Sequence, residues 1–380
     1  MVRNPALLGE GRAVRVGFGR EEIVMKQASL ALIVILLGAL LAMVGGCALF
    51  NRTEAVILLD VTSGIVPLTI TFDGTGSSGA DGISTYHWDF DTGDESYESS
   101  GTYTYQKAGT FTLTLTVRDQ DGKTDTAQAT IEIDPAIWLT DGNLDRVYKL
   151  DMNGNAIDFF DLSAKEPRGV TITEVNGQAV LAVACANEGF QRILYIDPVT
   201  GDLVAELPAP GQSPLQITYG AVGQKQLWHI DGLTRKLFRL NPPDGQIYEA
   251  YGQSYFKATS PEVRDVPFLW MPQGLDWTPL PNTLGRLWYL EGETHLLYEI
   301  EMIAGYDIMS NTQLRIAADP VEIVDEVFPV AAIDLYDGSL WAIDVDRHRI
   351  VQIDPSTGAL TGTEIYGFPG SAPAGLEIQH

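Results

Sequence analysis

Apolar and polar residues alternate with a period of two in short runs between residues 54 and 134, and none of these runs shows the period of a helix. In one run, Phe111, Leu113, Leu115 and Val117 fall on one side, with threonine residues between them. Successive side chains of a strand point to opposite faces, so this alternation predicts a strand with one buried face. Turn residues separate the runs, and the segment is therefore predicted to form a small β-sandwich.

From residue 135 to the end, short apolar runs recur in units of roughly 50 residues, a period typical of repeat folds such as propellers. Each unit has an apolar pair, usually with Trp, followed three residues later by an acid or amide and then by a second strand. The acid or amide positions are Asp141, Asn187, Asp231, Glu291 and Asp344. Their recurrence in every unit predicts a structural role in the turn between two strands.

The two ends of this repeat region complement each other. A short strand precedes four of the hairpins, and a further copy at residues 375–378 has no hairpin after it. The first hairpin, from residue 137, has no such strand before it. Joining the chain ends would complete one blade and remove exposed sheet edges. We predict an all-β chain with a propeller of five blades closed by the C-terminal strand, while long insertions at 248–272 and 302–329 leave a sixth blade possible.

The short strands would lie innermost in such a ring, so that equivalent positions face its axis. These positions are Thr171, Gln216, Asp276, Asp334 and Glu377. Carboxylates are the ligands that Ca²⁺ prefers, and another divalent metal at the axis could polarise an ester or activate water. The three acids are therefore candidate catalytic or metal-binding residues. The alternative is that each one hydrogen-bonds to a neighbouring blade.

Aromatic residues are frequent in the first long insertion. The candidates for binding a partner are Tyr248, Tyr251, Tyr255, Phe256 and Trp270. Loops on the faces of a scaffold often carry binding, and aromatic rings stack on sugars or anchor protein partners. The alternative is that these rings pack within an irregular blade.

The chain is strongly acidic, with 24 basic and 50 acidic side chains and a formal net charge of −26. Such a surface repels phosphate backbones and anionic lipid headgroups, which excludes nucleic acid as a partner. Attachment to a membrane would then have to come from a lipid or an apolar segment. The chain has two cysteines, Cys47 and Cys185.

The segment before the first domain reads as a secretory signal. An uncharged apolar run follows Lys26 and ends in Val44-Gly45-Gly46-Cys47, with small residues before the cysteine. This pattern resembles a bacterial lipoprotein signal with its lipobox. The resemblance implies cleavage before Cys47 and a lipid on its thiol. The alternative is a transmembrane anchor, because the run is long enough to cross a bilayer.

This interpretation divides the N-terminal part of the chain. Residues 1–24 show no periodicity, and we expect them to be a misassigned upstream extension, with translation starting at Met25. Residues 25–46 would be the signal peptide and residues 47–53 a lipidated tether.

The first domain, residues 54–134, contains Trp88-Asp89-Phe90 followed by Asp91 to Asp94, and later Ala108 to Phe111. These motifs resemble those of a PKD domain. The resemblance implies an immunoglobulin-like sandwich that serves as an extracellular spacer or adhesive module. Its acidic run, Asp89, Asp91 and Asp94, could hold Ca²⁺. The alternative is a solvated turn.

The second domain, residues 135–380, is similar to propellers of the NHL and YVTN types, as in residues 227–231 and 349–358. That resemblance indicates a fold and not an activity. Lactonase-like propellers hold a divalent metal at their axis, which implies an ester or lactone hydrolase if Asp276, Asp334 and Glu377 bind one.

Together these patterns predict a lipid-anchored extracytoplasmic binding or scaffold protein, in which the PKD-like domain is a spacer and the propeller face binds a protein or glycan. We favour this role over an enzymatic one, and a metal-dependent propeller hydrolase of the lactonase or esterase type is the alternative. The membrane partner would be reached through the lipid on Cys47. Because residue 48 is Ala and not Asp, we expect the outer membrane of a cell that has one, and otherwise the outer face of the cytoplasmic membrane.

Overall fold

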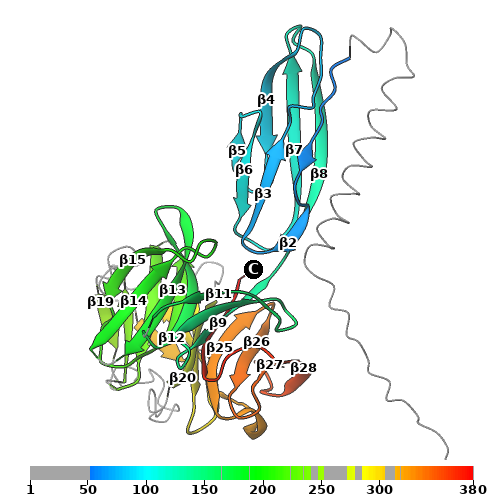
Figure 1. The fold of residues 1–380 in the computed structure, drawn as a ribbon. Coiled ribbons are helices and arrows are strands. Elements are labelled where there is room, and N and C mark those ends of the chain that lie inside the picture. The colour runs from blue at the N-terminus through cyan, green and yellow to red at the C-terminus, as the bar shows by residue number, and fades with distance from the viewer. Residues whose placement is uncertain are drawn as a thin grey trace, which may run out of the picture.

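A computed structural model describes residues 52–379 with the exception of residues 164, 188, 223, 234, 241–246, 252–271, 279–284, 304–312 and 317. The predicted signal, Cys47 and most of the tether therefore lie outside the described residues. Within the described part, no helix is long and apolar enough to cross a membrane. The described elements are strands, apart from one short 3-10 turn at Asp325–Val327. Figure 1 shows them as an upright sandwich above a group of small sheets.

The N-terminal sandwich has two sheets. One contains β1 (Leu58–Leu59), β3 (Leu68–Asp73) and β6 (Ser100–Tyr105). The other contains, in order, β2 (Ser63–Ile65), β8 (Thr124–Asp134), β7 (Gly109–Asp119), β4 (Ile83–Asp89) and β5 (Glu95–Ser96).

The core of the sandwich follows the predicted alternation. Leu113, Leu115 and Val117 on β7 are fully buried, and the threonines between them are more exposed. They pack around Trp88, whose indole N–H donates to the backbone oxygen of Glu98 at 2.9 Å. The prediction of a small β-sandwich is confirmed.

Five radial sheets follow in the described chain, and in each of them four antiparallel strands succeed one another from the axis outwards. Blade one contains β29 (Pro373–Gln379), β9 (Ala136–Asp141), β10 (Arg146–Leu150) and β11 (Ala156–Asp161). Blade two contains β12 (Pro167–Val175), β13 (Gln178–Asn187), β14 (Phe190–Ile196) and β15 (Leu203–Pro208). Blade three contains β16 (Pro214–Val222), β17 (Gln224–Asp231), β18 (Lys236–Leu240) and β19 (Ile247–Tyr251).

Blades four and five complete the series. Blade four contains β20 (Pro272–Thr278), β21 (Arg286–Glu291), β22 (Leu296–Ile303) and β23 (Gln313–Ile316), and the short β24 (Val321–Glu322) also pairs with β22. Blade five contains β25 (Val330–Tyr336), β26 (Ser339–Asp344), β27 (Arg349–Ile353) and β28 (Leu360–Tyr366).

The ring closes with five blades. The inner strands contact one another in the order β29, β12, β16, β20 and β25, and β25 contacts β29 again. Each described inner strand therefore contacts the next one around the ring, including β16 with β20 and β20 with β25. The C-terminal strand β29 pairs with β9, as predicted, so that Glu377 stands opposite Trp138. Both chain ends of the repeat region therefore share blade one.

The recurring acids make turn hydrogen bonds. Asp141 is fully buried, and its carboxylate accepts from the backbone N–H groups of Leu144 at 2.8 Å and Ala372 at 3.1 Å. Asp231 likewise accepts from the N–H of Gln212 at 2.7 Å. Asp141 thus ties its own hairpin to the loop that leads into β29, and Asp231 bonds to the loop that leads into β16, which is a structural role for both.

Blade two departs from the predicted alignment of the repeat. Cys185 pairs with Pro167 and Arg192, in the way that Asp231 pairs with Pro214 and Lys236 in blade three. Asn187 lies two residues further along, opposite Phe190. The assignment of Asn187 to the acid position is therefore wrong, because the hairpin of blade two is longer. Burial raises the pKa of the Cys185 thiol to about 12.

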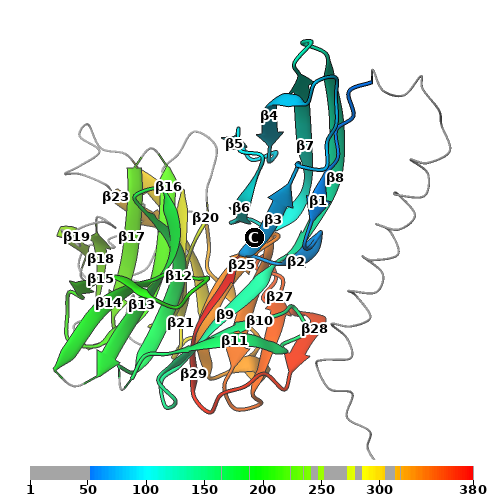
Figure 2. The same cartoon turned by 45° about the horizontal axis from the view of Figure 1, so that its top comes forward.

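The sandwich is hydrogen-bonded to the ring next to the C-terminus of the chain (Figure 2). The side chain of Gln379 donates to the backbone oxygen of Gln106 at 3.0 Å and accepts from the indole N–H of Trp138, also at 3.0 Å. Lys149 of blade one donates to the backbone oxygens of Ile65 and Pro67 at 3.4 Å. Burial lowers the pKa of Lys149 to about 8. The ring-closing strand is thus also a contact between the two domains.

Replacing Trp138 with Ala should destabilise the propeller by about 3–5 kcal/mol, because it leaves a cavity in blade one and removes a partner of Gln379. The free energy of unfolding in urea would measure this loss. Ile157→Ala in the same blade is the matched control, since Ile157 is 47 % exposed and such changes cost about 0.5 kcal/mol or less. Equal losses for the two variants would contradict the closure of the ring at blade one.

Candidate functional site

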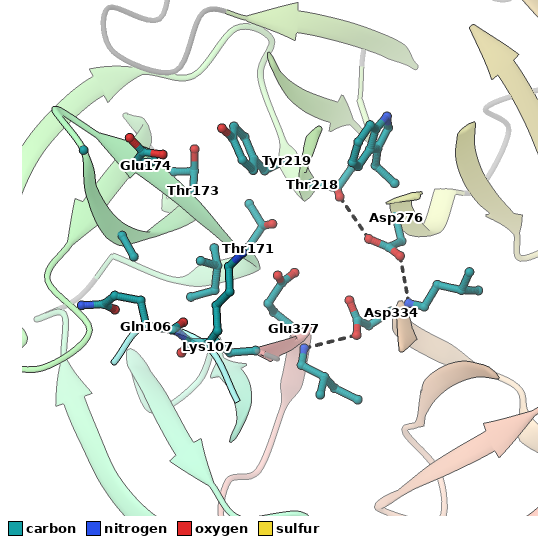
Figure 3. Close-up of a pocket in the computed structure, with 17 residues that line it drawn as sticks. Gln106, Lys107, Thr171, Thr173, Glu174, Thr218, Tyr219, Asp276, Asp334 and Glu377 are labelled. Atoms are coloured by element: carbon teal, nitrogen blue, oxygen red, sulfur yellow. Dashed lines mark hydrogen bonds between the residues drawn. The ribbon is translucent and has the colours of Figure 1, made fainter. Parts of the chain in front are cut away.

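A cavity of about 510 Å³ lies at the axis of the propeller, and the inner strands of all five blades line it. The equivalent positions are Glu377 in blade one, Thr171 in blade two, Thr218 in blade three, Asp276 in blade four and Asp334 in blade five. Figure 3 shows these side chains around the opening. The structure thus brings together the three acids that the sequence placed at the axis.

The register of the strands explains why these five positions correspond. Thr218, Asp276, Asp334 and Glu377 each pair with the tryptophan of the next strand in their blade. Thr171 pairs instead with Ala182. The side chains therefore lie at one level along the axis.

The repeat pattern predicts Gln216 at the axial position of blade three, and this prediction is wrong, because Thr218 occupies that position. Gln216 pairs two residues earlier in the register than the axial position, where the inner strands of blades one, two and four have Gly375, Gly169 and Gly274. Its side-chain N–H₂ donates to the backbone oxygens of Ala331 and Ala374, both at 2.8 Å. Gln216 therefore connects blade three with blades five and one and blocks the axis on the side where the inner strands begin.

The axial acids connect neighbouring blades. One oxygen of Asp276 accepts from the hydroxyl of Thr218 at 3.1 Å, and the other accepts from the N–H of Leu335 at 2.8 Å. Asp334 accepts from the N–H of Ile378 at 3.2 Å. Glu377 likewise hydrogen-bonds to the backbone of Ile172 and the side chain of Thr171 in blade two. These bonds correspond to the structural alternative for the acids, and Figure 3 shows Glu377 and Asp334 at the edge of the cavity.

Burial and mutual repulsion hold protons on this cluster. Burial raises the pKa of Asp276 to about 6. Burial, and then the charge of Asp276, raise the pKa of Glu377 to about 8. The pKa of Asp334 is well above its usual range because of burial and of the charges of Asp276 and Glu377. Near neutral pH the three acids therefore share protons and carry fewer than three charges.

No set of three or more histidine, cysteine or acidic side chains in the described residues is arranged to hold a metal ion. In the sandwich, the run with Asp89, Asp91 and Asp94 is used in local hydrogen bonds. Asp91 accepts from the N–H of Thr112 at 3.0 Å, and Asp94 accepts from the hydroxyl of Tyr103 at 2.7 Å. Asp89 accepts from the N–H of Asp91 at 2.9 Å.

Several residues of the cavity were missed by the sequence analysis. Tyr219 and Trp277 follow the axial residues of blades three and four and form part of its wall, and Gln106 and Lys107 come from the sandwich. The two aromatic residues could have been found from the strand register, because each stands directly after an axial position. The two sandwich residues have no such signal, since only the contact between domains brings them to the axis.

The predicted aromatic partner site is described only in part. Tyr255, Phe256 and Trp270 lie outside the described residues. The backbones of Tyr248 and Tyr251 belong to β19, the outer strand of blade three.

Comparison with known proteins identifies the sandwich. Residues 60–134 match the family model of the PKD domain. The pre-pro-metalloprotease PrtV of Vibrio cholerae is 42 % identical over 67 residues, which are 18 % of this chain and 7 % of the relative. Collagenase ColA of Clostridium perfringens is 37 % identical over 84 residues, which are 22 % of this chain and 8 % of the relative. This chain therefore spans less than a tenth of either relative.

Two solved structures are similar to parts of this chain. The PKD1 domain of the V. cholerae metalloprotease PrtV is 39 % identical and covers 22 % of this chain and 98 % of its own, with a TM-score of 0.20. The β-propeller domain of Myceliophteria thermophila Cps50 (Swd1) is 12 % identical and covers 73 % of this chain and 86 % of its own, with a TM-score of 0.36. The family model identifies residues 60–134 of this chain as a PKD domain.

Replacing Glu377 with Gln should flatten the pH dependence of stability. The pKa of Glu377 is about 8 in the folded protein, against an ordinary value of 4.5. Between these values the folded state binds more protons than the unfolded state, so the free energy of unfolding falls as the pH rises. Urea unfolding at pH 5 and pH 8 should show a smaller fall for Glu377→Gln than for the natural chain. The exposed Glu322→Gln is the control, and equal slopes for all three proteins would contradict the prediction.

Proposed function

We propose that this chain is a lipid-anchored extracytoplasmic binding protein whose ligand site is the axial cavity between the propeller and the PKD domain. One observation carries this proposal: all five inner strands and the PKD residues Gln106 and Lys107 contribute to one cavity. Ligand pockets commonly measure roughly 300–1,000 Å³ and combine apolar walls with a few convergent polar groups. The axial cavity has this size and this mixture.

The PKD domain then has a second role besides that of a spacer. Its β6–β7 loop carries Gln106 and Lys107 to the mouth of the cavity, and Gln379 holds the loop there through the backbone of Gln106. The domain would lift the propeller away from the membrane and also form one wall of the site.

A location outside the cytoplasm is supported by two features. The residues before Cys47 have the pattern of a lipoprotein signal. The relatives of the PKD domain include a pre-pro-metalloprotease and a collagenase, and collagen is an extracellular protein. The net charge of −26 disfavours nucleic acid and anionic lipid as partners.

A metal-dependent hydrolase that uses Asp276, Asp334 and Glu377 is the second candidate, because three acids meet at the axis. We favour binding, since both oxygens of Asp276 and one of Asp334 already accept hydrogen bonds from neighbouring blades. Those bonds use the atoms that a metal would need.

A thermal-shift screen tests the proposed site. The chain from residue 47 onward, with Cys47→Ser, would be melted with sugars, amino acids, short peptides and organic acids, each in excess. A ligand at 100 times its Kd stabilises the folded state by about 2.7 kcal/mol, which corresponds to roughly 5–10 °C for a domain of this size. At least one class should produce such a shift, and Asp334→Asn in the cavity should reduce it by more than half.

Asp337→Asn is the matched control for this screen, because Asp337 is exposed, lies three residues after Asp334 and has a left-handed φ of 49° that Asn tolerates. Its shift should equal that of the unchanged chain. If no class gives a shift that Asp334→Asn weakens, the axial site is not the binding site. A shift that requires Ca²⁺, Mg²⁺, Mn²⁺ or Zn²⁺ and disappears in EDTA would favour the hydrolase instead.

The lipid anchor has its own test. In a bacterial host, the natural chain should be found in the membrane fraction and incorporate labelled palmitate, whereas Cys47→Ser should lose the label and the membrane association. Cys185→Ala is the control, because Cys185 is buried in blade two. Retention of Cys47→Ser in the membrane would indicate a spanning segment in place of a lipid.

A further inference from the structure

We infer that the axial cavity binds an uncharged sugar residue at the end of a glycan chain, held by the threonine and carboxyl groups of the inner strands against Tyr219 and Trp277. This inference rests on the proposed binding function and specifies its ligand.

The polar wall suits the hydroxyl groups of a sugar. Each sugar hydroxyl both donates and accepts, so it needs partners that can do either. Thr171 and Thr218 line the cavity. Their hydroxyls bond to Glu377 and Asp276, and a hydroxyl that donates one bond can still accept another. Glu377 and Asp334 lie at the edge of the cavity (Figure 3), and a carboxyl group that keeps its proton also donates and accepts. The wall therefore offers hydrogen-bond donors and acceptors that carry little net charge.

The apolar wall suits the C–H face of a sugar ring. Tyr219 and Trp277 stand on adjacent inner strands and line the same cavity. The indole of Trp277 lies so close to Gly220 and Gly285 that an added Cβ would come within 2.6 Å and 2.5 Å of it. These two glycines leave the space that the ring occupies, so the indole is held in one position before a ligand arrives. A fixed aromatic surface loses little entropy when it binds.

The shape of the cavity favours the end of a chain over its middle. The side chain of Gln216 crosses the axis to blades one and five, so the cavity is closed on that side. On the other side it opens beside Gln106 and Lys107 of the PKD domain. A terminal residue could enter, and the remainder of the glycan would leave along the PKD loop.

The charges of the cavity favour an uncharged sugar over an acidic or a basic one. The titratable groups that line the cavity are Asp276, Asp334, Glu377, Glu174, Lys107 and Tyr219. An anionic sugar would meet four acids and one base. An amine would require the buried acids to ionise, which burial opposes. A neutral sugar avoids both costs, because the acids do not repel it and need not ionise to bind it.

The experiment compares sugars that share a ring and differ in charge. Calorimetric titration of the chain from residue 47 onward, with Cys47→Ser, would use neutral hexoses and N-acetylhexosamines, the matching hexosamines and the matching uronic acids. Neutral sugars should bind at least 10-fold more tightly than either charged series. Their affinity should fall as the pH rises from 6 to 8.5, because a bound sugar must then displace water from ionised acids, while Tyr219, whose pKa is about 12, stays neutral.

Two cavity variants and one control test whether the sugar binds in the cavity. Tyr219→Ala should weaken neutral sugars at least 10-fold, and Tyr97→Ala in the PKD domain should not, because Tyr97 is 68 % exposed and remote from the cavity. Lys107→Ala changes an exposed residue at the mouth, and it should weaken oligosaccharides more than monosaccharides. Lys107→Ala keeps the inference testable if Tyr219→Ala does not fold.

The outcomes distinguish this inference from the proposed function. Preferential binding of hexosamines with an affinity that increases with pH would overturn the sugar class and identify a cation site. Binding of a peptide or another solute that Asp334→Asn weakens would also overturn it, and the proposed binding function would stand. If no probe of any class binds in a way that depends on the cavity, both proposals fail.

Discussion

The pairing of the C-terminal strand β29 with β9 is the contact on which the other features of this molecule depend. It supplies the inner strand of blade one, so without it a sheet edge stays open and the ring has a gap. The same strand carries Glu377 into the cavity and Gln379 to the PKD domain. The closure of the ring, the formation of the site and the docking of the first domain therefore all depend on this strand.

The convergence of five strands on one axis explains the composition of the centre. Where the strands are closest, three blades have glycine, and an added Cβ at Gly375 would come within 2.4 Å of the Arg168 backbone oxygen. Blade three has Gln216 at this level, and its amide spans the axis. Two residues later along the inner strands the axis is wide enough for larger side chains, and the cavity begins there.

The buried acids have two opposing effects. Their hydrogen bonds join adjacent blades, which stabilises the ring, while the loss of water around each carboxyl group raises its pKa and weakens the folded state at alkaline pH. Clusters with such shifts are more frequent at functional sites than elsewhere. Here they face a cavity that also has aromatic walls and a contribution from the PKD domain, and we interpret the cost in stability as part of a binding site.

Local pattern was sufficient for much of this architecture. Alternation with a period of two predicted the sandwich strands, the repeat predicted the blades, and the unpaired strand at residues 375–378 predicted closure. Asp276, Asp334 and Glu377 were placed at the axis because each follows a small residue at a constant distance. These patterns can be read from the sequence alone, because the pleat of a strand and the spacing of a turn produce them locally.

The remaining features depended on the three-dimensional structure. Every inner strand has a bulge near its start. Blade three has Gln216 where blades one, two and four have glycine, so the sequence of its inner strand lacks the residue that marks the register. The predicted axial residue, Gln216, therefore lies two residues before the observed one, Thr218. The longer hairpin of blade two concealed Cys185 in the same way. The contact of Gln379 with Gln106 joins residues 273 positions apart, and no local pattern encodes it. The sequence by itself determined which strands form and which faces they bury, whereas the packing of the domains decided which side chains share the cavity, because contacts between distant segments exist only once the ring has closed.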